Sequence, residues 1–405
     1  MKMYHTMFRD LERNTYFQKL YPTVNNEDLL EFRIPGNTKA NMCLSNVLLR
    51  FVVQVPEIND AEVLYPENFL GHKQFSSVEV RINGDAVSRR NCSNEYFLSA
   101  YFQYLINFSS DYLTTSCSSI GVFDSVAVGE TEISENTPLS NNVILLRKGI
   151  NDDFKFEIVM PIDASIFTSN QTLPTNTPIE ISFERAQTKL STVLSETVVT
   201  TSVPTVLDLE DAYILVPFTI DADMQNMEKM AVERPIQLKY DDYSINRFNI
   251  SKDSPNVRLA NVLTGQMPTK IFYGIMDLSA YTGDFYKPST CFSRKGVKKA
   301  TLYVDGNVLS GYPISVDESS VSIPYIRLQE NINRYMNCYS SRVISQRDFK
   351  NYYFIYSAVL DPSSSGSLTF EFDFETEPAG DFILITCCVF EKTLEIDFFR
   401  NFKIL

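Results

Sequence analysis

Hydrophobic side chains alternate with polar ones in many short segments of this chain, and this pattern constrains the fold more than any other feature. In residues 368–375, leucine and phenylalanine alternate with threonine and acidic residues. A period of two places alternate side chains on opposite faces of a strand, so each such segment predicts a strand with one buried face. The pattern predicts further strands over 47–55, 154–160, 179–184, 213–220, 236–248, 271–277, 352–359 and 382–397.

Segments with helical periodicity are few. Residues 94–107 are apolar on nearly all sides, residues 325–336 follow Ser322 and Pro324, and residues 222–232 carry methionines at helical spacing. A parallel sheet needs a helical crossover between successive strands, and this chain offers too few helices for that arrangement. The expected class is therefore all-β, with a few short helices in the connections.

Two segments of the chain repeat one another at a separation of 222 positions. VEVRINGDAVS at 78–88 and ATLYVDGNVLS at 300–310 are both alternating strands that turn at Asn83-Gly84 and at Asp305-Gly306. Such pairs favour a type I′ hairpin, because both central residues of that turn need a positive φ. In each case an aromatic helical segment follows. Chance repetition of hairpins in a β protein is the alternative to a true duplication.

A duplication gives the chain two similar β units of about 180 residues, the size of a sandwich with long loops. The predicted boundaries are an N-terminal arm at 1–26, a first unit at 27–221, a connector helix at 222–234 and a second unit at 235–405. The arm is polar and aromatic without a clear period, so we expect it to lie outside the core.

Composition excludes several classes of protein. Lys and Arg number 36 against 50 Asp and Glu, which gives a formal net charge of −14 and disfavours direct binding of nucleic acid. The longest apolar run, residues 382–390, is less than half the length needed to cross a membrane. The seven cysteines lack the paired spacing of a metal site, so we expect reduced and mostly buried thiols.

Residues that carry chemistry are scarce. The two histidines, His5 and His72, leave little from which to build a catalytic triad, and His72 is predicted to be an ordinary surface or loop histidine. No glycine-rich phosphate loop occurs, and neither a metal nor another cofactor is expected. Glu371, Asp373 and Glu375 predict a solvated strand face rather than a pair of catalytic carboxylates. The basic cluster of Arg294, Lys295, Lys298 and Lys299 is interpreted as solvated, with contact to phosphate or to an acidic partner as the alternative.

The second unit also resembles a known family. The stretch TGQMPTKIFYGIMDLSAYTGDFYKPSTCF at 264–292, followed by ATLYVDGNVL, resembles the double jelly-roll major capsid proteins of Maverick/Polinton elements and adinto-like viruses. The closing segment at 390–405 is similar to the last strand of that family, and the first unit resembles it more loosely. The residues that carry the resemblance are Gly265, Gln266, Pro268, Gly274, Gly283, Asp305, Gly306, Glu395, Asp397 and Arg400.

The resemblance implies two tandem eight-stranded antiparallel jelly rolls. It also implies that three copies form a pseudo-hexagonal capsomer, and that capsomers tile an icosahedral shell around double-stranded DNA. The expected partners are further copies of this chain and a penton or minor capsid protein, and the expected location is the virion, assembled inside the host cell. The family has no catalytic residues, so no enzymatic activity is expected.

Two other functions stay open at this point. Jelly rolls also serve as carbohydrate-binding or receptor-binding modules, because a fold alone does not decide function. A hydrolase that uses two carboxylates is the remaining alternative, and nothing in the sequence pairs its carboxylates for that role.

Overall fold

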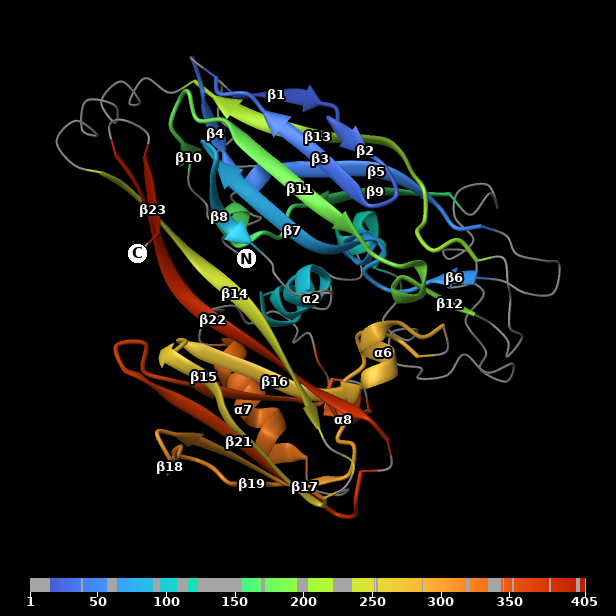
Figure 1. Cartoon of the computed structure of the whole chain (residues 1–405), viewed down its shortest axis with the longest axis vertical. Helices are drawn as coiled ribbons and strands as arrows, with labels where there is room; N and C mark the ends of the chain where they lie inside the picture. The colour runs from blue at the N-terminus through green and yellow to red at the C-terminus, as the bar shows by residue number, and fades with distance from the viewer. Residues whose placement is uncertain are drawn as a thin grey trace.

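The computed structural model describes most of the chain. The described residues are 15–37, 39–56, 64–89, 95–107, 116–122, 155–168, 172–194, 203–220, 235–250, 252, 254–285, 287–317, 321–333, 344, 346–351, 353–378, 380–397 and 401–404. Figure 1 shows two β halves, the first above and the second below, with a helix between them. The predicted connector helix at 222–234 lies outside the described residues.

The first half is a sandwich of two antiparallel sheets. One sheet carries the neighbouring strands β1, β13, β5 and β9, and the other carries β3, β11, β7 and β8. The strands are β1 (Thr15–Leu20), β3 (Leu29–Ile34), β5 (Leu48–Gln54), β7 (Phe75–Ile82), β8 (Asp85–Arg89), β9 (Lys155–Pro161), β11 (Ile179–Arg185) and β13 (Leu209–Thr219). Phe51 and Phe75 meet across the sandwich with ring centroids 5.8 Å apart, so the core lies between the two sheets.

The second half repeats this arrangement. Its sheets have the orders β14-β22-β16-β20 and β15-β21-β17-β18. The strands are β14 (Ile236–Ile250), β15 (Asn256–Gln266), β16 (Lys270–Asp277), β17 (Val297–Val304), β18 (Asn307–Val308), β20 (Ile355–Val359), β21 (Ser365–Phe374) and β22 (Phe382–Ile396). Tyr273 packs against Phe370 with centroids 4.7 Å apart, which places this core between its two sheets as well.

The two halves have the same strand order in the chain and in space. Taken in chain order, the eight strands of the first half occupy the sheet positions of the eight strands of the second. In each half the polypeptide therefore folds as an eight-stranded jelly-roll sandwich. Short strands extend these sheets or pair beside them: β2 (Val24–Asn25), β4 (Asn41–Cys43), β6 (Leu64–Pro66), β10 (Thr172–Leu173), β12 (Thr192–Leu194), β19 (Ile314–Ser315) and β23 (Phe402–Ile404).

The repeated hairpins have the predicted geometry. Asn83 and Gly84 have φ of 53° and 90°, and Asp305 and Gly306 have φ of 50° and 77°. Ile82 pairs with Asp85, and Val304 pairs with Asn307, so each loop has two residues. These two-residue turns confirm the hairpins predicted at both dipeptides. A turn whose two central residues have positive φ matches the twist of the flanking strands.

The predicted N-terminal arm is in part a strand of the sandwich. Thr15–Leu20 form β1, which pairs antiparallel with β13 from Thr219 to Ile214 and occupies the position that β14 has in the second half. Its sequence lacks a clear period because β1 pairs on one side only and is partly exposed on both faces. The first sandwich therefore begins no later than Thr15, and residues 1–14 lie outside the described part.

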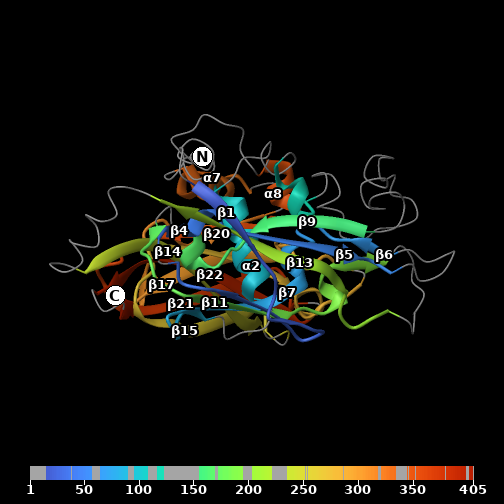
Figure 2. The same cartoon turned by 90° about the horizontal axis from the view of Figure 1, so that it is seen from above.

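The helices lie in the connections between strands. They are α2 (Glu95–Asn107), α6 (Leu278–Thr282), α7 (Ser322–Asn333) and α8 (Gln346–Asn351). Helix α2 confirms the helix predicted over 94–107, and α7 begins three residues before the predicted 325–336 because Pro324 is accommodated in its first turn. Both helices follow the repeated hairpin of their half. Figure 2 shows α2 near the centre of the molecule and α7 and α8 along one edge.

Candidate functional site: the interface between the two halves

One shallow cavity of about 250 Å³ lies beside α6 and contains charged groups. Its lining residues are Asp277, Ala280, Lys287, Pro288, Cys291, Ser293 and Lys295. Lys295 donates to Asp277 at 2.6 Å, and Lys287 donates to Ser279 at 3.1 Å, so both cations already have partners. Burial raises the pKa of the Cys291 thiol to about 11, which keeps it protonated and weakly nucleophilic. Within the described ranges no group of three His, Cys, Asp or Glu residues could hold a metal ion.

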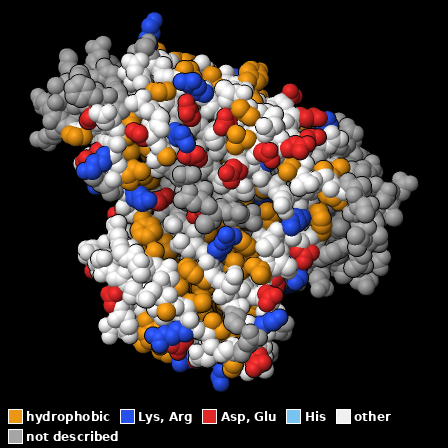
Figure 3. Space-filling model, in the orientation of Figure 1, with side chains coloured by type: hydrophobic (Ala, Val, Ile, Leu, Met, Phe, Trp, Pro, Cys, Tyr) orange, Lys and Arg blue, Asp and Glu red, His pale blue; other side chains and the backbone are white. Residues whose placement is uncertain are grey.

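The charged clusters noted in the sequence pair with each other on the second half. Arg294 binds Glu375 through two hydrogen bonds, Lys299 lies 3.4 Å from Asp373, and Tyr303 donates to Glu371. Glu375 and Asp373 therefore neutralise neighbouring cations, and Glu371 accepts from a neutral hydroxyl. The face in Figure 3 likewise intermixes acidic and basic side chains, without a continuous field of one sign.

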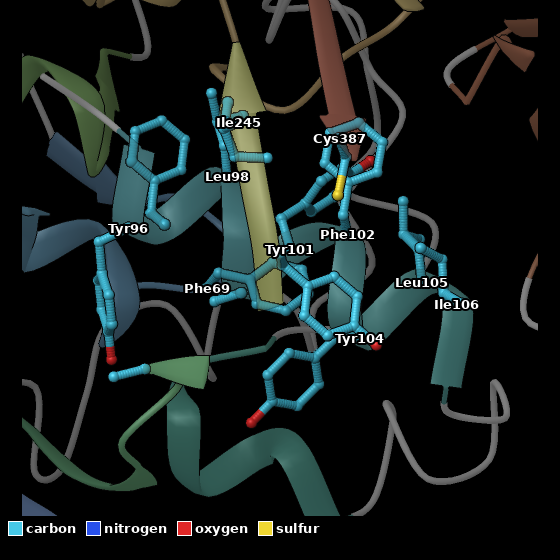
Figure 4. Close-up of a cluster of buried hydrophobic side chains, with 14 of the residues drawn as sticks. Phe69, Tyr96, Leu98, Tyr101, Phe102, Tyr104, Leu105, Ile106, Ile245 and Cys387 are labelled. Carbon is cyan, nitrogen blue, oxygen red and sulfur yellow. The ribbon is translucent and has the colours of Figure 1, made fainter. Parts of the chain in front are cut away.

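Helix α2 is the centre of the contact between the two halves. Every residue from Glu95 to Ile106 is buried, although the helix lies between two sandwiches rather than within one core. Figure 4 shows Leu98 and Phe102 on the side of α2 near Ile245 of β14 and Cys387 of β22. The helix is aromatic and apolar on all sides because one side faces the first half and the other faces the second.

Phe292 joins the second half to this helix. Its ring stacks on Tyr101 with centroids 6.1 Å apart and lies 5.5 Å from the ring of Phe102. The Phe292 ring also lies against Gly274 of β16, where an added Cβ would be 2.6 Å from Cδ1 of Phe292. Gly274 therefore provides the room that brings this aromatic contact close to the sheet.

Buried polar groups also cross the interface. Glu67 of the first half accepts hydrogen bonds from the backbone N–H of Ser289, at 3.3 Å, and from its hydroxyl, at 3.2 Å. Lys73 donates to the same carboxylate, and both charged side chains are almost completely buried. Asn107 at the end of α2 donates to Tyr243 of β14 at 3.2 Å. Oε2 of Glu67 accepts from Lys73 of its own half and from Ser289 of the second half, so one buried carboxylate oxygen links the two halves.

The prediction for His72 is wrong. Its side chain is completely buried beneath α2, with Nε2 3.0 Å from Oδ2 of Asp163 and Nδ1 3.3 Å from the hydroxyl of Tyr96. Burial lowers the pKa of His72 to about 3 and raises the pKa of Asp163 to about 8, so both groups are uncharged at neutral pH. The sequence around Gly71 and His72 is typical of a surface loop, but these residues form a short turn that is buried against the sheet.

The residues that carry the family resemblance do not converge on one site. Gly274 and Gly283 both lie at the contact between the halves, since a Cβ at Gly283 would meet the side chain of Lys189. The others lie elsewhere: Gly265 and Gln266 at the end of β15, Pro268 buried before β16, Glu395 within β22 and Asp397 after it. Glu395 accepts from Gln237, Asp397 accepts from Asn401, and Arg400 is outside the described residues.

Sequence reasoning missed the contacts that hold the halves together. Phe292, Glu67 and Ser289 are separated from their partners by more than a hundred residues, and no local period marks them. The one available signal was the apolar character of 94–107 on all sides, which indicates a helix covered on every face.

Known proteins were compared with the chain in three ways. No family model matches it. The uncharacterized protein F54H12.2 of Caenorhabditis elegans is 22% identical over 401 residues, which cover 92% of each chain. No helix of the described part is both long and apolar enough to cross a membrane.

Solved structures resemble it along nearly the whole length. A chain of the Sputnik virophage has a TM-score of 0.66 at 10% identity, covering 97% of this chain and 88% of that one. The mavirus major capsid protein has a TM-score of 0.56 at 12% identity, covering 96% and 90%. A chain of the PBCV-1 virus capsid has a TM-score of 0.52 at 10% identity, covering 96% and 97%. With the repeated strand order, these matches show that the chain has the double jelly-roll fold seen in viral major capsid proteins.

Proposed function

We propose that this chain is the major capsid protein of a Maverick/Polinton-type element or related virus. Three copies form a pseudo-hexagonal capsomer, and capsomers tile an icosahedral shell around a double-stranded DNA genome. The observation that carries the proposal is the duplication of one sandwich within one chain, in the fold of the mavirus capsid protein.

The duplication supports this geometry in a simple way. Two sandwiches with the same strand order give a chain two similar sides, so three chains in a closed ring present six. Such a ring fits a lattice position with six neighbours. The buried contact between the halves holds each pair of sandwiches in a fixed relation, as a rigid tile requires.

The net charge suggests which partners the shell needs. At −14 per chain, the protein does not neutralise packaged DNA by itself. The proposal therefore includes a separate basic protein or small cations inside the shell. It also includes a penton or minor capsid protein at the fivefold vertices, where a duplicated unit has no matching symmetry.

The assignment to Maverick/Polinton-type elements rests on the sequence. The motif from Gly265 to Phe292 and the closing strand with Glu395 resemble that family. A relative of matching length in Caenorhabditis elegans is in keeping with capsid genes carried in host genomes.

The native mass of the recombinant chain tests the proposal. Light scattering coupled to size exclusion should give three times 46.3 kDa, about 139 kDa, at every step of a dilution series. Electron microscopy of concentrated protein should then show trimers with a six-sided outline. A monomer of 46.3 kDa that persists on concentration contradicts the proposal.

A further inference from the structure

Equivalent sheets of the two halves differ in how much of their outer face is covered. In β16 and β20 of the second half, residues on both faces are buried along nearly the whole strand. In β5 and β9 of the first half, only every second residue is buried. The two sheets have the same strand order, so one of them has a cover that the other lacks.

The cover of the second half is α2 of the first. In one row across that sheet, Ile245 pairs with Cys387 and Cys387 pairs with Phe272. Ile245 and Cys387 are near α2 in Figure 4, so this row points away from the core of the second half and toward the helix. A helix therefore packs on the outer face of β14, β22 and β16.

The equivalent row of the first half is half-buried and has no helix packed on it in the described part of the chain. Phe272 corresponds to Arg50 at the same 222-residue separation as the repeated turns, and Arg50 pairs with Tyr213 and Val159. Tyr21 extends this row from the end of β1, with its ring 6.3 Å from that of Tyr213. Tyr21 is 64% exposed. Phe17 is also exposed, so the β1 edge of the face formed by β1, β13, β5 and β9 presents aromatic groups to solvent. The rest of the face is half-buried and carries the ion pair of Arg50 with Glu157.

Helix α7 is the counterpart of α2, and one of its sides is uncovered. Each helix follows the repeated hairpin of its half and precedes the equivalent strand, β9 or β20. The inner side of α7 packs on its own half through Leu328 and Ile332. Its outer side carries Ile323 and Ile326, which are 53% and 52% exposed and lie three residues apart on one helical face.

We propose that the outer side of α7 in one copy packs on the outer face of β1, β13, β5 and β9 in a second copy. The inference rests on the proposed function and adds which surfaces meet. Within one chain, the helix after the hairpin of the first half covers the sheet of the second half. Repeated between chains, the same contact places the helix of the second half on the first half of the next copy.

This contact is head-to-tail. The helix and the sheet are different surfaces, so every copy contributes its helix to one neighbour and its sheet to the other. The proposal takes the contact between chains to repeat the contact within the chain, with a rotation that returns to the first copy after three chains, so that six sandwiches form a ring. Figure 2 shows α7 at an edge of the molecule.

Single substitutions on each surface test the inference. Ile326→Asp places a charge on the outer side of α7, and Tyr21→Asp places one on the receiving sheet. Val308→Asp is the matched control, because Val308 is also an exposed apolar residue but lies on the β18 hairpin. All three positions are exposed, so circular dichroism and melting temperature should match those of the wild-type chain.

Native mass across a dilution series gives the result. Ile326→Asp and Tyr21→Asp should each weaken the trimer by about 30-fold or more, the loss expected for a central interface residue, while Val308→Asp should remain a trimer. An equimolar mixture of the two interface variants retains one intact contact per pair. It should therefore form heterodimers of twice 46.3 kDa, about 93 kDa, and no trimers.

The outcomes separate this inference from the proposed function. A wild-type trimer that both interface variants leave unchanged overturns the choice of surfaces and leaves the capsid proposal standing. A mixture of the two variants that forms no heterodimer shows that the contact is not head-to-tail. A wild-type chain that is monomeric overturns both.

Discussion

Replacing Gly274 with alanine probes the contact on which the relation of the two halves depends. The new Cβ would lie 2.6 Å from Cδ1 of Phe292 and 3.1 Å from the carbonyl oxygen of Phe354. Carbon atoms in contact are normally about 3.5 to 4.0 Å apart, so the ring must move by about 1 Å. Movement of the ring is restricted, because Phe292 is completely buried and also stacks on Tyr101.

The expected cost follows from overpacking. Extra methyl groups in a packed core cost about 1 to 3 kcal/mol, and loss of glycine flexibility in a strand returns about 0.5 to 1 kcal/mol. The difference between these terms runs from about 0 to 2.5 kcal/mol, and the short contact of 2.6 Å favours its upper part. We therefore expect Gly274→Ala to lower the free energy of unfolding by about 1 to 2.5 kcal/mol. The matched control is Gly380→Ala, because Gly380 has no positive φ and, among the described residues, a Cβ there would meet only Phe382, at 3.8 Å.

Denaturant titration and hydrogen exchange provide the assay. Gly274→Ala should lower the unfolding midpoint and speed amide exchange in α2, whereas Gly380→Ala should do neither. Phe292→Leu should relieve the crowding, so the double variant should be more stable than the sum of the single effects by about 0.5 kcal/mol or more. Equal stability of the two alanine variants, or strict additivity with Phe292→Leu, would refute the crowding argument.

Three further predictions follow from other parts of the chain. Folded Asp163 keeps its proton up to about pH 8 and unfolded aspartate loses it near pH 4, so this group makes stability fall as pH rises between these values. Buried His72 makes stability rise with pH below about pH 6.5, so it offsets the effect of Asp163 in that range. The melting temperature of the wild-type chain should therefore fall between pH 6.5 and 8, and Asp163→Asn should abolish this loss. An unchanged pH profile would contradict the assignment. Gly306→Val should lower the melting temperature through strain at φ 77°, with a cost of about 1 to 2 kcal/mol, and a chain as stable as wild type in calorimetry would contradict it. The purified protein should not bind duplex DNA with sub-micromolar affinity at physiological salt, which fluorescence anisotropy measures directly.

Most strands with one buried face were predictable from the sequence, and the reason is local, although β3, which also buries one face, was not predicted. In β21 the alternation from Leu368 to Phe374 reflects a single sheet face that packs on a core. Strand β15 was not predicted, because a bulge at Asn261, with φ of 53°, breaks the period between Leu259 and Leu263. Strand β1 was missed because an edge strand needs little apolar surface.

The interface was harder to predict than the strands. Tyr101 and Phe292 are far apart in the chain, and their contact depends on how two complete sandwiches pack. The burial of His72 likewise depends on a partner, Asp163, that is 91 positions away in the sequence. Periodicity reports which face of a strand is covered, but it does not report what covers it.

The contact through α2 also bears on how assembly responds to protein concentration. Two sandwiches on one polypeptide meet at an effective concentration set by the chain between them, which for short tethers is on the order of millimolar. The aromatic and polar contacts around Phe292 and Glu67 therefore form when the chain folds, at any dilution. In the proposed ring, six separate sandwiches would need five bimolecular encounters, whereas three tethered pairs need two. Fusing the two sandwiches thus lowers the kinetic order of ring closure, and with it the concentration at which rings can form.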